Sequence, residues 1–325
     1  MRDQPMDVDE GALLGALKEW GLAPETVTYA PVGFGDHHWI ARASGGDRWF
    51  VTVADLPGKT YCGDGADAAF GGLRMAMDTT WHLSERAGLP FVVAPLRTPD
   101  GETVLRLGQR YGLSVFPYAD GAPGEFGQAL TPEERAPVID MLAVLHGTAT
   151  PAPVPVARLE LPARAELEEA LAEAHSPWHG GPYAEPARAL TAEHAAGLRR
   201  RLSEFDRRAA AVRGEPVVTH GEPHPGNVLR APGGALLVDW DTVGLAPPER
   251  DLWLVAAEPA DLDRYAYATG RHLDPSVLTL YRLRWSLADV SLFLSYFRSS
   301  HGRTADAEQS WAGLTGTVEW LTTSG

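Results

Sequence analysis

Strand and helix patterns divide this chain into two parts, and that division limits the folds it can adopt. Up to about Tyr118 most segments are rich in β-branched and aromatic residues and end at turn signals, which is typical of strands. One long helix pattern, Ala66–Ala87, interrupts them. Beyond Tyr118 helix patterns predominate around two short apolar strands, Val217–Thr219 and Leu236–Asp239. We therefore expect an α+β chain of two lobes: residues 1–116 with a five-stranded sheet, and residues 117–325, mainly helical.

Local signals place the other elements. A first helix over Glu10–Trp20 ends at Gly21, a typical C-cap residue. Thr131 is the expected N-cap, and Pro132 the first residue, of a helix that runs through His146. The strand patterns lie at Val27–Val32, Trp39–Ala43, Trp49–Val53, Phe91–Leu96, Thr103–Leu107 and Leu113–Tyr118. Further helix patterns lie at Ala163–Ala174, at Ala187–Val212 and after Arg250, and Thr150–Pro155 is expected to be a linker or loop.

Composition excludes several classes of protein. A hydrophobic share of 44% supplies enough apolar material for a core, which excludes disorder as the main state. The net charge of −15 argues against a nucleic-acid partner, which would require a basic face. No stretch approaches ~18 consecutive apolar residues, and Met1–Glu10 is acidic, so we expect no membrane partner and a cytoplasmic location. Cys62 is the only cysteine, so the chain forms no internal disulfide and no Cys-rich metal site.

Two loops hold the densest cluster of chemically active residues. His220–Asn227 follows the first short strand, and Val238–Asp241 follows the second, with Pro248–Asp251 shortly after. Together they supply carboxylates, imidazoles and an amide oxygen. Hard oxygen ligands of this kind suit Mg²⁺, which usually takes one or two protein groups and completes its shell with phosphate and water. Phosphoryl transfer also needs a residue that accepts the proton of the attacking hydroxyl.

This arrangement resembles the H-G-D-x-H-x-x-N and I-D-x-D motifs of the aminoglycoside phosphotransferase family, whose fold is bilobal and protein-kinase-like. Within that family the segment Val238–Asp251 is most similar to the spectinomycin-type phosphotransferases. The resemblance extends over most of the chain, and the two motifs of the second half are its specific part. It implies Mg²⁺ as cofactor, ATP or GTP as nucleotide co-substrate between the lobes, and a hydroxylated small molecule as acceptor.

The resemblance assigns roles to residues of the two loops. Asn227 and Asp239 match the two metal-binding positions of the family. Glu222 stands where the family has its catalytic aspartate, so it is expected to orient the substrate hydroxyl and accept its proton. His224 occupies a place where kinases often put a basic group near the transferred phosphate, which makes it a candidate catalytic residue. The alternative is that it only forms a hydrogen bond to Asp239 or Asp241. Asp241 is expected to contact either a second metal ion or the substrate.

Three further residues complete this half of the site. His220 is expected to pack and to hold its loop by hydrogen bonds. Asp251 is expected to support the same loop by accepting backbone N–H groups. Asp289 lies in the last third of the chain, where the family builds its substrate pocket, so it is a candidate substrate contact that competes with an ordinary charge on a helix face.

The first lobe is expected to bind the nucleotide. Gly33 and Gly35 match the loop over the phosphates, although Gly-x-Gly alone is a weak signal. Phe116 and Tyr118 belong to the segment that matches the hinge, where backbone groups meet the adenine edge.

One position in this lobe departs from the pattern. Thr52 stands where the family has the lysine of the third strand, and the following helix has no glutamate at the matching place, near Arg74. The chain has only two lysines, Lys18 and Lys59. The cation at the phosphates is therefore expected to come from Arg74 or from Lys59, against the alternative that both are solvated surface charges.

These observations predict an enzyme that moves the γ-phosphoryl group of Mg-ATP or Mg-GTP to a hydroxyl of an antibiotic, with resistance by inactivation as the result. The resemblance suggests an aminoglycoside or aminocyclitol, and the acidic second half agrees with a cationic acceptor. Nucleoside antibiotics, choline, homoserine and sugars stay open as acceptors. A non-catalytic nucleotide-binding module is the main alternative, because Glu222 and Thr52 both depart from the pattern. A protein kinase is a third, disfavoured by the short segment between Asp239 and Asp251.

Overall fold

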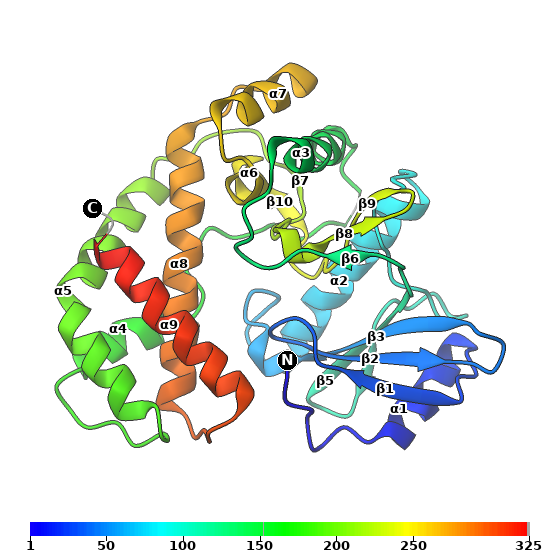
Figure 1. The fold of residues 1–325 in the computed structure, drawn as a ribbon, viewed down its shortest axis with the longest axis horizontal. Helices are drawn as coiled ribbons and strands as arrows, with labels where there is room; N and C mark the ends of the chain where they lie inside the picture. The colour runs from blue at the N-terminus through cyan, green and yellow to red at the C-terminus, as the bar shows by residue number, and fades with distance from the viewer. Residues whose placement is uncertain (152, 324–325) are drawn as a thin grey trace. The chain divides into compact units, whose positions relative to one another are not determined.

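An antiparallel sheet organises the first part of the chain in the computed structural model, which describes residues 1–151 and 153–323. Its strand order is β1-β2-β3-β5-β4, and Figure 1 shows β1, β2 and β3 side by side. The strands are β1 (Thr26–Ala30), β2 (His37–Arg42), β3 (Arg48–Asp55), β4 (Leu105–Leu107) and β5 (Tyr111–Pro117). Since each pair of neighbours is antiparallel, short turns suffice to join β1 to β2 and β2 to β3.

Alternation along the strands gives this sheet two different faces. Helix α1 (Glu10–Leu17) and the 3₁₀ turn η1 (Lys18–Trp20) cover one face. The core on that face contains Leu13, Leu17, Trp20, Val51, Val53, Leu113 and Val115. The intervening residues belong to the other face, where Thr52 pairs with Ser114 and Phe50 pairs with Phe116 in the register of β3 and β5. Thr52 and Phe116 therefore share the face that is turned away from α1.

Helix α2 (Ala66–Glu85) follows the 3₁₀ turn η2 (Leu56–Gly58). The two helices predicted for this part of the chain, which correspond to α1 and α2, are confirmed to within a few residues. The predicted strand Phe91–Leu96 is wrong, because that segment contains only an isolated bridge. Pro90 and Pro95 have no N–H group and cannot donate to a ladder. The segment is instead held at single points, where the N–H of Val93 donates to Leu237 and the N–H of Leu96 donates to Val115.

The chain divides into two units, which we describe separately. Unit 1 comprises Met1–Arg158 and Glu215–Leu273, and unit 2 comprises Leu159–Gly214 together with the described chain from Asp274 onward. The predicted boundary between residues 116 and 117 lies inside unit 1, so that division into lobes stays a prediction. Of the predicted linker Thr150–Pro155, residue 152 lies outside the described residues.

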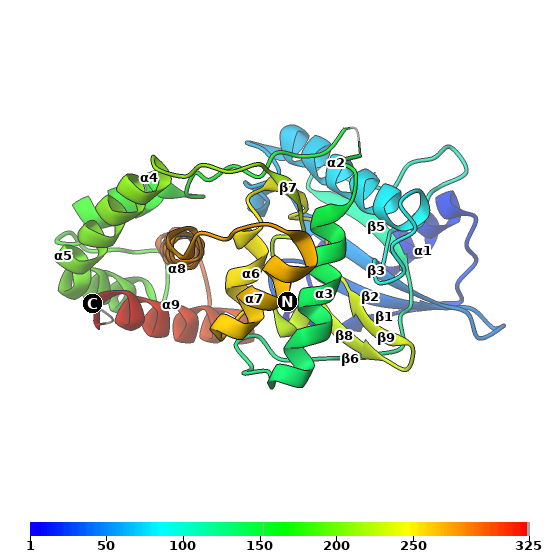
Figure 2. The ribbon, with the colours of Figure 1, turned by 90° about the horizontal axis from the view of Figure 1, so that it is seen from above.

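Beyond its large sheet, unit 1 contains helices and two small sheets. Besides α1 and α2, its helices are α3 (Pro132–Gly147), α6 (Glu249–Val255) and α7 (Pro259–Thr269), and α3 lies beside α7 in Figures 1 and 2. Strand β7 (Val217–Thr219) pairs with β10 (Gly244–Ala246). Strand β8 (Val228–Ala231) lies between β6 (Ala122–Pro123) and β9 (Gly234–Leu237), and the 3₁₀ turn η3 (Pro225–Asn227) precedes β8.

The predictions for this region were partly right. The N-cap of α3 is confirmed, because Thr131 and Glu134 bond each other's backbone N–H groups in a capping box. Strand Val217–Thr219 is confirmed at its predicted residues. The second short strand ends at Leu237 rather than Asp239, so Val238–Asp241 is a loop that follows the sheet directly.

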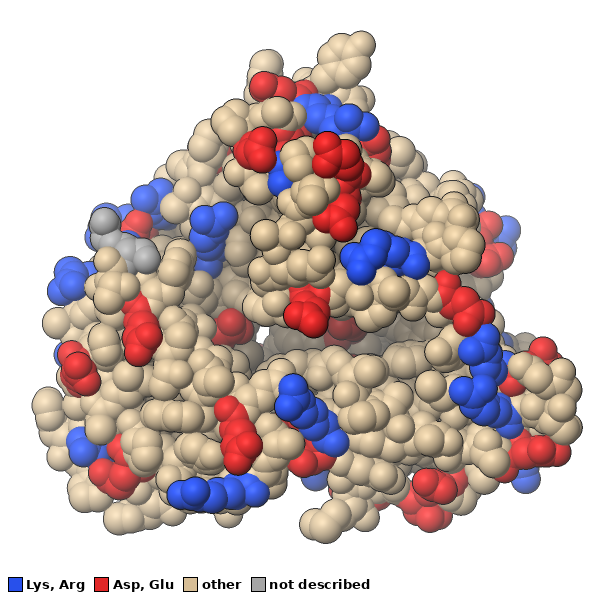
Figure 3. All heavy atoms as spheres, in the orientation of Figure 1, with Lys and Arg blue, Asp and Glu red and all other residues tan. Residues whose placement is uncertain are grey.

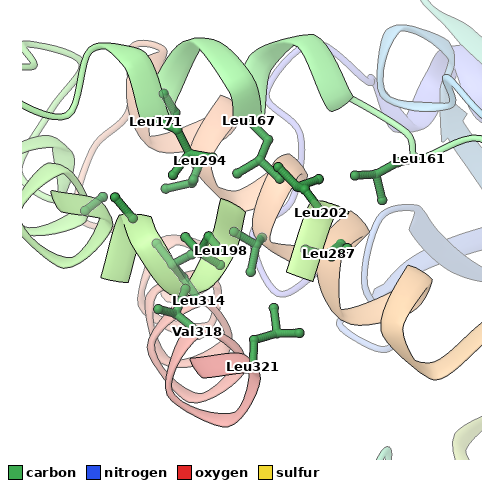
Figure 4. Packing of buried hydrophobic residues seen from close by; sticks show 14 of the residues in the cluster. Leu161, Leu167, Leu171, Leu198, Leu202, Leu287, Leu294, Leu314, Val318 and Leu321 are labelled. Carbon is green, nitrogen blue, oxygen red and sulfur yellow. The ribbon is translucent and has the colours of Figure 1, made fainter. Parts of the chain in front are cut away.

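Unit 2 consists of helices around one apolar core. They are α4 (Arg164–Ala172), α5 (Ala184–Ala209), α8 (Pro275–Arg298) and α9 (Ala305–Thr323), which confirms the helix patterns predicted there. Figure 4 shows leucine side chains of these helices pointing toward one another, among them Leu167, Leu198, Leu294 and Leu314. All four are buried, so the helices are held together by one continuous hydrophobic cluster.

Taken by element type, the chain is α+β, as predicted. Among the described residues, none of the helices combines the length and the apolar character needed to cross a membrane. Acidic and basic side chains are interspersed over the face drawn in Figure 3, which is typical of a solvated surface.

Candidate functional site

The loop His220–Asn227 is fixed to the body of unit 1 by a buried carboxylate. Asp251, near the start of α6, accepts the N–H of His220 at 2.8 Å and the N–H of Gly221 at 2.6 Å. It also accepts a hydrogen bond from Nε2 of His146 at 3.0 Å. Burial raises the pKa of Asp251, but the His146 hydrogen bond and nearby positive charges outweigh it and hold the pKa below its usual value. The role predicted for Asp251 is confirmed.

His220 joins the two loops of the site to each other. Its Nε2 donates to the carbonyl oxygen of Val238 at 2.9 Å, and its Nδ1 accepts the N–H of Glu222 at 3.2 Å. The residue is fully buried, and burial lowers the pKa of its imidazole. A neutral ring with one donor and one acceptor matches both bonds, so the structural role predicted for His220 is confirmed.

Asn227 and Glu222 are neighbours in this arrangement. The amide nitrogen of Asn227 donates to the carbonyl oxygen of Glu222 at 3.0 Å. Its own backbone carbonyl accepts the N–H of Val238 at 3.1 Å, which draws the second loop against the first. Since the amide nitrogen is used within the loop, the amide oxygen is the atom of Asn227 that can bind a cation.

Asp239 lies in a crowded yet accessible position. Its backbone has a φ of 64°, a conformation that non-glycine residues rarely adopt outside turns and functional sites. Desolvation by the surrounding protein, followed by the charges of Asp241 and Glu222, raises the pKa of Asp239 well above its usual value. The residue is nevertheless exposed to solvent. The nearby negative charges of Asp241 and Glu222 would favour a cation beside Asp239.

A buried lysine lies at the edge of this carboxylate group. Nζ of Lys59, just after η2, is 2.9 Å from a carboxylate oxygen of Asp36 and 2.5 Å from one of Asp241. The hydroxyl of Tyr61 accepts from Nζ at 2.8 Å and donates to Asp241 at 2.6 Å. Lys59 is only 5% exposed. Burial lowers the pKa of Lys59, but the charges of Asp241 and Asp36 have the larger, opposite effect. The pKa is therefore raised overall, and the ammonium stays charged.

Of the two predicted sources of a cation, the structure brings only one to the carboxylates. Arg74 forms an ion pair with Glu102 at 3.4 Å, and its side chain is 50% exposed. Thr52, at the position of the expected lysine, contacts Nδ1 of His38 through its hydroxyl at 3.2 Å. Lys59 therefore contacts Asp241 of the second loop, whereas the described contacts of Arg74 and Thr52 lie elsewhere.

The predicted nucleotide-binding residues occupy a turn and a strand end. Gly33 and Gly35 have φ values of 71° and 100°, so the turn between β1 and β2 requires residues that tolerate the left-handed region. Phe116 is at the end of β5 and pairs with Phe50. Tyr118 follows β5, and its N–H donates to the carbonyl oxygen of Arg48 at 3.4 Å. The guanidinium carbon of Arg48 lies 4.1 Å from the centroid of the Tyr118 ring.

His224 differs from the cation that its position in the motif suggested. Burial lowers the pKa of its imidazole to about 4, so the ring is uncharged at neutral pH. The ring packs edge-on against Phe126, with centroids 5.0 Å apart. The role of His224 near the transferred phosphate stays a prediction.

Asp289 belongs to α8 of unit 2. Burial raises the pKa of its carboxyl to about 7, against a smaller opposite effect of Trp285. A carboxyl that titrates near neutral pH in a helical unit is unusual. The role of Asp289 as a substrate contact stays a prediction.

Two residues of the cluster were missed by the sequence reasoning. Asp36 and Tyr61 both contact Lys59, yet neither belongs to a motif that was singled out. Asp36 directly follows the glycine turn, and Tyr61 lies two residues after Lys59. These positions next to the glycine turn and next to Lys59 are the sequence features that could have indicated the two residues. The contact of Lys59 with Asp241 joins residues 182 positions apart, so local sequence does not predict it.

The chain is similar to known proteins over most of its length. Residues 46–293 match the family model described as the phosphotransferase enzyme family. Protein StrN of Streptomyces griseus is 31% identical over 296 residues, which cover 86% of this chain and 83% of that protein.

Several solved structures share the fold. A spectinomycin phosphotransferase in complex with ADP and spectinomycin has a TM-score of 0.74 at 16% identity, covering 97% of this chain and 98% of that one. A microcompartment-associated aminopropanol kinase has a TM-score of 0.60 at 14% identity, over 97% and 98% of the two chains. An amicoumacin kinase in complex with AMP-PNP and Ca²⁺ has a TM-score of 0.59 at 14% identity, over 98% and 94%. At such identities these matches show the fold, and the predicted kinase-like fold is confirmed.

Proposed function

Because the chain belongs to the phosphotransferase enzyme family, we propose that it transfers the γ-phosphoryl group of Mg-ATP or Mg-GTP to a hydroxyl of a small-molecule antibiotic. The family resemblance predicted from the two motifs is thereby confirmed. The observation that carries the proposal is the joined pair of loops. Hydrogen bonds join the loop of Glu222 and Asn227 to the loop of Asp239, and the charge of Glu222 affects the pKa of Asp239.

The residues present fit a magnesium ion. Asp239 offers an exposed carboxylate whose raised pKa reflects crowding by Asp241 and Glu222, and a bound cation would relieve that crowding. Asn227 offers its amide oxygen, because its amide nitrogen donates to Glu222. In the described residues no group of three His, Cys, Asp or Glu side chains has a metal-binding arrangement. That agrees with Mg²⁺, which takes few protein ligands and keeps waters and phosphate oxygens. When bound, the ion would neutralise charge on the phosphates.

Glu222 is the proposed proton acceptor of the reaction. The acceptor's hydroxyl oxygen forms a bond to the γ-phosphorus while the bond from that phosphorus to the bridging oxygen breaks, and the nucleoside diphosphate leaves. The hydroxyl proton passes to the carboxylate of Glu222. The backbone of Glu222 is held by His220 and by Asn227, so the loop fixes the position from which the longer side chain reaches.

We take the acceptor to be an aminoglycoside or aminocyclitol, with inactivation of the antibiotic as the biological result. The similarity to a spectinomycin phosphotransferase supports this class, and the net charge of −15 suits a cationic acceptor. Asp289 is the proposed contact for a positive group of the acceptor. Similarity to an aminopropanol kinase and an amicoumacin kinase supports the alternative of another hydroxylated acceptor, such as a nucleoside antibiotic, choline, homoserine or a sugar.

The role of Glu222 is tested by separating turnover from binding. Glu222→Gln keeps the shape of the side chain but cannot accept a proton, so kcat should fall by about 10²–10⁴-fold. The dissociation constant of Mg-ATP, measured by calorimetry, should stay near the wild-type value. Glu215→Gln is a matched control. Glu215 lies just before β7, the strand that precedes the Glu222 loop, and its side chain is 89% exposed. Equal turnover in the Glu222→Gln variant and the control would contradict the proposal. Nucleotide binding without turnover in the wild type would favour a non-catalytic nucleotide-binding module.

A further inference from the structure

The site needs a cation that the third strand does not supply. A nucleoside triphosphate carries several negative charges, and the position of the expected strand lysine holds Thr52, whose hydroxyl contacts His38. No glutamate stands at the matching place in α2 to pair with such a lysine. A cation and a carboxylate partner must therefore come from other backbone positions if the chain binds nucleotide phosphates as its family does.

Lys59 and Asp36 provide such a pair in the described structure. They lie on different segments: Lys59 follows β3 and η2, and Asp36 follows the glycine turn. Their charged atoms are 2.9 Å apart, and the residues are 5% and 7% exposed. Lysine is rarely buried, because removing its charge from water is costly unless carboxylates compensate. Here two carboxylates and the Tyr61 hydroxyl compensate, so this burial is a built feature of the site.

The location of the pair gives it a function. Asp36 is three residues beyond Gly33, in the turn that matches the phosphate loop. On its other side Lys59 contacts Asp241, two residues beyond the proposed metal ligand Asp239. The ammonium therefore lies between the phosphate turn and the metal-binding loop, where the β- and γ-phosphates of a nucleotide would have to be.

We propose that Lys59 binds the nucleotide phosphates and that Asp36 positions it, so that this pair replaces the missing strand lysine and helix glutamate. The inference rests on the proposed function, since it assigns residues to the same nucleotide site. Asp36 acts through Lys59 and touches no reacting atom. Tyr61 and Asp241 also contact the ammonium in this structure.

Calorimetry with two ligands tests the phosphate role. Lys59→Met should weaken Mg-ATP binding by about 10–100-fold, the usual effect of losing a hydrogen bond to a charged group. Adenosine, which has no phosphate, should bind to the variant as it does to the wild type. Lys18→Met is the matched control, because Lys18 is the other lysine of the chain and is exposed. Lys59→Arg keeps the charge and should bind Mg-ATP more tightly than Lys59→Met.

A double-mutant cycle tests the positioning role. Asp36→Asn alone should weaken Mg-ATP binding, and it should have no further effect once Lys59 is methionine. Asp36→Glu, which retains the charge, should recover part of the loss. The proposal is overturned if Lys59→Met binds Mg-ATP as the Lys18→Met control does. It is also overturned if ATP and adenosine weaken equally, or if the Asp36 and Lys59 effects are additive. A wild-type protein that binds neither Mg-ATP nor Mg-GTP would instead contradict the proposed function itself.

Discussion

At the scale of single residues, Asp251 shows how a buried carboxylate can organise a site without touching substrate. It is fully buried and accepts hydrogen bonds from His220, Gly221 and His146. Two of these bonds come from the backbone of the loop that carries Glu222. Bonds to a charged acceptor are stronger than bonds between neutral groups, so the charge of Asp251 contributes to the rigidity of that loop.

Replacement of Asp251 by asparagine should therefore lower stability in a pH-dependent way. We expect Asp251→Asn to lower the free energy of unfolding by about 1.5–3 kcal/mol at pH 7, because one oxygen becomes an amide donor. The folded-state pKa is depressed, so the wild-type advantage is complete above the unfolded carboxyl pKa of about 3.9 and is lost as pH falls through the folded value. Urea unfolding of both proteins between pH 7 and pH 3 measures this difference. A difference that grows toward acid would contradict the assignment.

At the scale of elements, α2 positions the segment that carries Lys59 and Tyr61. Its Gly72 allows close approach, because a Cβ there would collide with the carbonyl oxygen of Cys62. The adjacent Gly71 has open space around the same position. Gly72 is therefore required by a backbone contact. Gly71 is not, and it only lowers the helix propensity of α2.

This pair makes a controlled test of the packing. Gly71→Ala should raise the free energy of unfolding by up to about 1 kcal/mol, because alanine is the better helix former. Gly72→Ala should lower it by about 1–3 kcal/mol, since the backbone must move to relieve the collision. It should also weaken Mg-ATP binding, because the displaced segment carries Lys59. Thermal unfolding and calorimetry of both variants check these signs. Equal effects of the two substitutions would show that the approach of Cys62 to α2 is unimportant.

How far the sequence allowed these elements to be predicted depends on the range of the interactions. The helices and most strands follow from local periodicity, and the start of α3 follows from Thr131 and Pro132. The strand expected at Phe91–Leu96 is absent because Pro90 precedes the segment and Pro95 interrupts it. The Glu222–Asn227 loop was found because its chemistry is contiguous in sequence. The ion pair between Asp36 and Lys59 was not predicted, because it depends on two turns that are distant in sequence and meet in the folded chain.

At the scale of the whole molecule, the proposed roles are divided between the two units. Glu222, Asn227, Asp239 and the Lys59 cluster all belong to unit 1. Unit 2 is a helical body with its own core, and the proposed acceptor contact Asp289 lies on its helix α8. We therefore expect substitutions in unit 2 to change the use of the acceptor while nucleotide binding stays the same.

Asp289→Asn tests this division, with spectinomycin as the probe. The variant should raise KM for spectinomycin and leave KM for Mg-ATP unchanged. Because burial raises the pKa of Asp289 to about 7, the carboxyl ionises as pH rises from 6 to 8, and only the charged form attracts a cation. The ratio of variant to wild-type KM should therefore increase by up to about tenfold over that range. A ratio independent of pH would remove Asp289 from the acceptor site.

The most direct test of the central claim follows the γ-phosphoryl group itself. The protein is incubated with Mg²⁺ and ATP carrying ¹⁸O on the γ-phosphate, or with GTP labelled in the same way. The mixture contains spectinomycin, other aminoglycosides, nucleoside antibiotics and simple amino alcohols, and each is examined by mass spectrometry. We predict that one acceptor gains a single labelled phosphoryl group, and that this product is nearly absent with Glu222→Gln. Nucleotide bound by the wild type with no labelled acceptor, or the same product formed undiminished by Glu222→Gln, would contradict the account.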